Sequence, residues 1–138
     1  MTFIAFNSLT KQLGELFKRK DHTNPQWTIS PDGAHIGELR EDTIVVLSLG
    51  GQIEQTIHVA GWPNLRSLDW TADGNAFLAA SVGSTKATLL RIGRDGGIQP
   101  IWEMRNLVWT WAIPSPDGQY LAIRGASMNS NAWLIENF

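Results

Sequence analysis

The chain has 138 residues, enough for one domain with a hydrophobic core, and its formal net charge is −2. This weak charge gives no electrostatic field that would hold nucleic acid or an anionic membrane surface. The absence of cysteine excludes disulfides, thiolate metal sites and cysteine nucleophiles, and leaves the compartment open. Charged residues make up 17% of the chain, fewer than usual, so we expect part of its surface to meet other protein.

The N-terminal segment fits two structures. Phe3–Phe6 is a short apolar run that predicts a buried strand. Within Ser8–Lys20 the apolar residues have the spacing of an amphipathic helix with Ser8 as N-cap, but the repeat described below places Gln12–Lys18 on a strand. The repeat favours a strand, and a helix stays open. No run approaches the roughly 18–20 apolar residues of a membrane span, and no signal peptide is recognisable, so we expect a soluble chain without membrane insertion.

A four-residue turn sequence occurs three times. The copies are Ser30-Pro31-Asp32-Gly33, Thr71-Ala72-Asp73-Gly74 and Ser115-Pro116-Asp117-Gly118. Proline presets φ for the second turn position, aspartate caps its own backbone, and glycine accepts the positive φ that follows. We therefore interpret Ser30, Pro31, Asp32, Gly33, Asp73, Gly74, Ser115, Pro116, Asp117 and Gly118 as structural turn residues. Successive aspartates are 41 and 44 residues apart, the spacing of a tandem repeat.

Each turn joins two predicted strands, and further strands follow within the unit. The first complete unit contains Trp27–Ile29, His35–Arg40, Thr43–Leu49 and Gln52–Val59. The second contains Leu65–Trp70, Phe77–Val82, Thr88–Ile92 and Ile98–Met104. The third contains Val108–Ile113, Tyr120–Arg124 and Ala132–Glu136. The β-branched run Thr43–Leu49 is apolar enough to be covered on both faces, whereas Gln52–Val59 has the pattern of an exposed outer strand.

Four antiparallel strands per unit, with one turn signature each, are typical of β-propeller blades. The sequence predicts an all-β fold and a single domain, residues 1–138, with blades at about 1–26, 27–63, 64–106 and 107–138. About three blades per chain make a partial propeller, because closed rings have about 4–8.

The ends of the chain suggest how such a partial ring closes. The first unit supplies only outer strands, and the last lacks its outermost strand. We hypothesise a head-to-tail homodimer of about six blades, in which Gln12–Lys18 of one chain completes the last blade of the other. This hypothesis leaves Phe3–Phe6 without a place. A piece of a longer propeller is the alternative.

No residue pattern points to catalytic, cofactor-binding or metal-binding residues. His22, His35 and His58 lie in separate contexts and predict no metal site. Gly50-Gly51 and Gly96-Gly97 are explained as hairpin turns, not as phosphate loops. The charged cluster from Glu38 to Asp42 is expected to be a solvated blade edge. We interpret the seven tryptophans as apolar filler between sheets and not as a ligand cage. They are Trp27, Trp62, Trp70, Trp102, Trp109, Trp111 and Trp133.

Two segments carry a family resemblance. Trp-x-x-Ser-Pro-Asp-Gly at 27–33 and Ser-Pro-Asp-Gly-x-Tyr-Leu-Ala at 115–122 resemble the WD40-like PD40 repeat. That repeat occurs in the propellers of TolB and of the prolyl oligopeptidase family. Residues 111–138 look like the terminal blade of TolB-type propellers appended to bacterial kinases and regulators. The resemblance covers nearly the whole chain and implies a propeller of the bacterial cytoplasm or periplasm, but propellers host unrelated functions.

Two functions remain compatible with the sequence. The first, which we favour, is a non-enzymatic scaffold or binding module for protein or peptide partners that assembles with itself into a ring. The second is a propeller fragment of a larger enzyme, such as the gating domain of a prolyl-oligopeptidase-like hydrolase or the sensor of a bacterial serine/threonine kinase. A nucleophile elbow is missing from Gly125–Asn129, which argues against an oligopeptidase catalytic domain in this chain.

Overall fold

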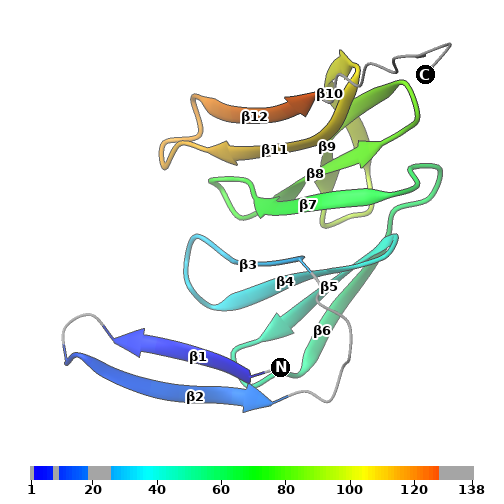
Figure 1. Ribbon diagram of the computed structural model, residues 1–138. Coiled ribbons are helices and arrows are strands. Elements are labelled where there is room, and N and C mark those ends of the chain that lie inside the picture. Colours follow the sequence, from blue (N-terminus) through cyan, green and yellow to red (C-terminus); the bar gives the residue numbers. More distant parts are fainter. Residues whose placement is uncertain (1, 8–9, 19–25, 128–138) are drawn as a thin grey trace, which may run out of the picture.

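The computed structural model describes residues 2–7, 10–18 and 26–127. These residues form twelve strands in four antiparallel sheets and no helix (Figure 1). The expected all-β fold with propeller-type blades is therefore confirmed. Within the described ranges, no helix is long and apolar enough to cross a membrane.

Two of the sheets are complete blades of four strands each, paired in chain order. The first blade consists of β3 (Gln26–Ile29), β4 (His35–Arg40), β5 (Thr43–Ser48) and β6 (Ile53–His58). The second blade consists of β7 (Leu65–Trp70), β8 (Ala76–Val82), β9 (Lys86–Gly93) and β10 (Ile98–Arg105). In both blades the last strand is largely exposed, as expected for the outer edge of a propeller.

The other two sheets are hairpins at the two ends of the stack. The leading hairpin pairs β1 (Thr2–Asn7) with β2 (Gln12–Lys18), and the trailing hairpin pairs β11 (Leu107–Pro114) with β12 (Leu121–Ser127). Figure 1 shows them on opposite sides of the two complete blades. The segment Gln12–Lys18 is thus a strand, and the helical alternative is wrong because its backbone pairs with β1. The strand expected at Ala132–Glu136 lies outside the described residues.

The main core lies between the two complete blades. Ile44 and Val46 of β5 belong to the same buried cluster as Trp70 and Phe77 of the second blade. The alternate residues Val45 and Leu47 pack on the opposite face. Because successive side chains of a strand point to opposite faces, β5 is covered from both sides, as its uninterrupted apolar sequence predicts.

The leading hairpin docks on the far face of the first blade. Phe3 is buried against Val45 and Leu47, and its ring stacks on Phe17 with the centroids 4.4 Å apart. This result corrects one part of the assembly hypothesis. The strand expected at Phe3–Phe6 is not left over, because it is the hydrogen-bonded partner of Gln12–Lys18.

Candidate functional site

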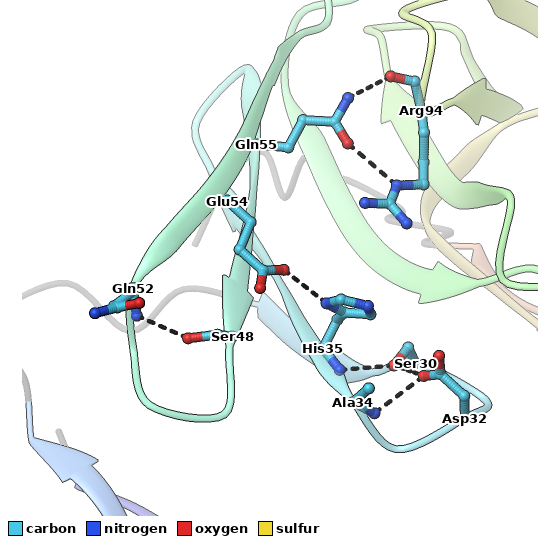
Figure 2. Close-up of polar contacts among 9 residues, drawn as sticks. All are labelled: Ser30, Asp32, Ala34, His35, Ser48, Gln52, Glu54, Gln55 and Arg94. Carbon is cyan, nitrogen blue, oxygen red and sulfur yellow. Dashed lines mark hydrogen bonds and ion pairs between the residues drawn. The ribbon is translucent and has the colours of Figure 1, made fainter.

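The turn between β3 and β4 is held by its own side chains. The Ser30 hydroxyl donates to Asp32 Oδ1 at 2.5 Å, and the Ala34 amide donates to the same oxygen at 3.0 Å. Ser30 Oγ in turn accepts the His35 amide at 2.9 Å. The turn closes with a bond of 2.8 Å from the Gly33 amide to the Ser30 carbonyl, and Gly33 has a φ of 71°. Figure 2 shows the bonds that join Ser30, Asp32, Ala34 and His35.

The same network recurs in the other two turns. In the second turn, Asp73 Oδ1 accepts the Thr71 hydroxyl at 2.5 Å and the Asn75 amide at 3.0 Å. In the third, Asp117 Oδ1 accepts the Ser115 hydroxyl at 2.5 Å and the Gln119 amide at 3.1 Å. The three aspartates, which the sequence places at equal positions, therefore have equal geometry, and each uses one oxygen inside its own turn.

These hydrogen bonds lower the pKa of all three carboxyl groups below the ordinary value of 3.8. The largest cause is the hydroxyl donor two residues before each aspartate, and the backbone amide two residues after it adds to the effect. The carboxylates are therefore negatively charged at neutral pH. A general acid needs the opposite shift, so this geometry suits a fixed anionic surface better than proton transfer.

The three turns also lie next to one another. A Cβ atom placed on Gly74 would lie 3.8 Å from Pro31 Cδ, and one placed on Gly118 would lie 3.4 Å from Ala72 Cβ. The second residue of each of the first two turns thus lies beside the glycine of the next turn. We call this continuous surface, residues 30–33, 71–74 and 115–118, the turn row. At one end, Gly33 has open space among the described residues, and at the other Pro116 is exposed.

Polar bonds between the blades fix their relative positions. On the inner strands, Thr28 Oγ1 donates to Asp69 Oδ1 at 2.9 Å. Farther out, Gln55 donates to the Arg94 carbonyl at 2.5 Å, and Arg94 Nε donates back to Gln55 Oε1 at 3.1 Å (Figure 2). These links hold the first blade against the second.

The charged cluster from Glu38 to Asp42 is not uniformly solvated, contrary to the sequence-based expectation. The Glu38 side chain is completely buried, and its Oε2 accepts hydrogen bonds from Arg40 Nε at 3.1 Å and Nη2 at 2.8 Å. Because successive side chains of a strand alternate, Glu38 shares one face of β4 with the buried Ile36, whereas Leu39 belongs to the cluster on the opposite face. Comparison of the repeats could have predicted this burial. Glu38 stands eight residues after Ser30, and the equivalent position of the second blade is the buried Ala79.

The histidines make separate, ordinary contacts. His35 Nδ1 lies 2.7 Å from Glu54 Oε2, and His58 Nδ1 lies 3.7 Å from Asp42 Oδ1. His22 is outside the described residues. Residues 2–7, 10–18 and 26–127 contain no group of three or more histidine and acidic side chains that could hold a metal ion.

Most of the described tryptophans are at least partly buried, and one is exposed. Trp70 fills the core between the blades, with its ring 4.0 Å from that of Phe77, as the filler interpretation predicts. Trp62 and Trp102 are partly buried against the core, and Trp109 and Trp111 meet edge to face on β11. Trp27, however, is 55% exposed on β3, which the filler interpretation did not predict. Trp133 lies outside the described residues.

Comparison with known proteins supports the fold and does not extend to a family. No protein-family model and no curated protein matches the sequence. A solved structure of a putative 6-phosphogluconolactonase from Bacteroides fragilis matches with a TM-score of 0.52 at 17% identity, over 85% of this chain and 38% of that one. A protein from Lactobacillus plantarum matches with a TM-score of 0.48 at 16% identity, over 90% of this chain and 44% of that one. This chain therefore spans less than half of either, and the first likeness shows a β-propeller-like fold alone.

Proposed function

We propose that the chain is a non-enzymatic β-propeller module, with PD40-type repeats, that holds a protein or peptide partner on its turn row. The observation that carries the proposal is the turn row itself, where three carboxylates lie on adjoining turns and are fixed by hydrogen bonds. Groups that are already ordered lose little conformational entropy when they bind, so such a surface is suited to recognition. It needs no cofactor.

The charge of the row indicates the chemistry of the partner. Asp32, Asp73 and Asp117 are ionised at neutral pH, because their pKa values lie below the ordinary 3.8. Lysine and arginine side chains are the complementary groups. We therefore expect the partner to present a basic, extended segment.

A peptide library tests this proposal. Random peptides displayed on phage are selected on the immobilised chain, and the affinities of the selected peptides are measured by calorimetry. In the triple variant D32N/D73N/D117N, each asparagine keeps an acceptor for the turn but removes the charge. We expect selected peptides to be basic and to bind this variant at least tenfold more weakly. The control E54Q/E103Q removes two charges from outer strands and should bind normally. Equal binding to all three proteins would contradict the proposal.

A second candidate function is a propeller fragment of a larger enzyme. The observation that favours it is the partial coverage of the Bacteroides fragilis protein, of which the match spans 38%. An activity assay distinguishes the two candidate functions. The purified chain is incubated with 6-phosphogluconolactone and, separately, with proline-containing peptides. Turnover that exceeds the uncatalysed rate would favour the enzyme and count against a module whose role is binding.

A further inference from the structure

The two end hairpins have the positions of two halves of one blade. The leading hairpin lies over the outer part of the first blade: Phe3 packs on β5, and the Phe17 ring lies against Gly51 in the turn between β5 and β6. The trailing hairpin is built around the turn 115–118, the equivalent of the inner turns of both complete blades, and β11 lies beside β7. One hairpin therefore supplies outer strands, and the other supplies inner strands.

We propose that β12 of one copy pairs with β1 of a second copy, so that the two hairpins form a composite blade of strand order β11-β12-β1-β2. The twelve described strands then amount to three blades per chain, and two copies close a ring of six, within the usual range of about 4–8. The proposal goes beyond peptide binding, since the turn row exists in each copy whether or not the ring closes.

Exposed apolar side chains mark the surfaces that this pairing covers. Among the described residues, eleven large apolar side chains are exposed, and eight of them lie on β3 or on the end hairpins. The eight are Ile4, Leu13, Trp27, Ile29, Ile113, Tyr120, Leu121 and Ile123. Such a concentration at the two ends indicates an interface, because apolar patches of a folded protein are ordinarily small and scattered.

Comparison of the two complete blades shows what β3 lacks. Trp27 and Ile29 stand three residues and one residue before their turn, as Leu68 and Trp70 do in the second blade. Leu68 and Trp70 are each 2% exposed, because the first blade covers them. Trp27 and Ile29 are 55% and 53% exposed. The missing cover is the inner half of a preceding blade, which the trailing hairpin of the second copy would provide.

The registers of the complete blades predict which residues meet at the seam. Ile123 follows Ser115 by eight residues, as Glu38 follows Ser30, and Glu38 pairs with Val45. One repeat of 41 residues before Val45 stands Ile4. The side chains of β1 have the orientation that this register requires. Phe3 packs towards the first blade, and Ile44, 41 residues later, packs towards the second blade. Ile123 and Ile4, which are 39% and 59% exposed, therefore become cross-strand neighbours.

The turn row gives independent support. Within the chain, Pro31 lies beside Gly74 and Ala72 lies beside Gly118, so that among the described residues Gly33 is open at one end and Pro116 is exposed at the other. Continuing the same contact from copy to copy places Pro116 of one chain on Gly33 of the other. The row then becomes a closed circle of six turns around the axis of the ring.

A disulfide between copies tests the seam. The chain has no cysteine of its own, so the double variant I4C/I123C contains only the two thiols of interest. Cross-strand neighbours have the Cα separation that a disulfide requires. We expect mild oxidation to give a covalent dimer on non-reducing gels, reversed by a reductant. The control I4C/I53C moves the second thiol to exposed β6, and we expect it to remain unlinked. Equal linking of both variants, or linking of neither, would overturn the proposal.

Light scattering during size-exclusion chromatography gives the second measurement. We expect the unmodified chain to have twice its chain mass of 15.3 kDa, with no larger species, because the ring is closed. I123K should raise the dissociation constant at least tenfold, whereas I53K should not change it. A concentration-independent mass of one chain would overturn the proposal, and it is the result expected if the chain's own residues 132–136 occupy the β12 edge. Peptide binding by such a monomer would leave the proposed function standing.

Discussion

Gly37 lies directly against the ring of Phe77, where the first blade meets the second. A Cβ atom on Gly37 would come within 2.6 Å of Phe77 Cε1 and 3.3 Å of Trp70 Nε1. Both rings are buried in the core between the blades, so neither has space to move away. The absence of a side chain at residue 37 therefore sets how closely the two blades approach.

The substitution Gly37→Ala should destabilise the protein. Because the added methyl group overpacks a rigid core, we expect the free energy of unfolding to fall by about 1–3 kcal/mol. Urea denaturation followed by tryptophan fluorescence measures the change. The control is Gly14→Ala on β2, where no described residue lies within 4 Å of the added atom. A loss of the same size in both variants would show that strand propensity, not the contact with Phe77, is responsible.

Arg40→Ala should lower the free energy of unfolding by more than an ordinary surface substitution does. Removal of the guanidinium takes two hydrogen bonds from the completely buried Glu38 carboxylate, and breaking such a pair costs roughly 3 kcal/mol. Lys86→Ala is the matched control, because the Lys86–Glu103 pair has a comparable distance of 2.7 Å but is about half exposed. We expect the control to leave the urea midpoint almost unchanged. A small effect of Arg40→Ala would mean that Glu38 is accommodated without its arginine.

The turn aspartates should make the fold sensitive to acid. Their pKa values in the folded protein lie below the ordinary 3.8, so the unfolded chain binds these protons more tightly than the folded one. The stabilising contribution is therefore present above pH of about 4 and is lost as the pH falls through the lowered values.

Urea midpoints between pH 7 and pH 2.5 measure this loss. The variant D32N/D73N/D117N should be less stable than the unmodified protein at pH 7 and should lose less stability on acidification. Parallel pH profiles of the two proteins would assign the acid sensitivity to other carboxyl groups.

Ala72→Pro should stabilise the second turn. Ala72 occupies the position held by Pro31 and Pro116 in turns with the same hydrogen bonds. Because proline restricts the unfolded chain without loss of a native bond, we expect a gain of about 0.4–1 kcal/mol. Ala34→Pro is the contrasting variant, since its amide donates to Asp32 and its loss should destabilise the first turn. A destabilising Ala72→Pro would show that the second turn has a different backbone.

The sequence by itself determined the local chemistry of this protein. The order serine or threonine, aspartate and glycine specifies each inner turn, since every hydrogen bond of the turn joins residues within five positions of one another. The same is true of the outer turns, where Gly51 and Gly96 have φ values of 80° and 87°. Repetition of these local units was sufficient to predict four-stranded blades, and the uninterrupted apolar run of β5 was sufficient to predict that both of its faces are covered.

Only the tertiary structure decided which surfaces are covered. Trp27 and Leu68 hold equivalent places, yet one is exposed and the other buried, because only Leu68 has a complete blade in front of it. Glu38 is buried through packing with other strands, and Gln12–Lys18 became a strand through pairing with β1. Such contacts join residues of separate strands, where burial and backbone pairing outweigh local preference. The sequence therefore predicted the three turns, but it did not predict that they form a continuous row.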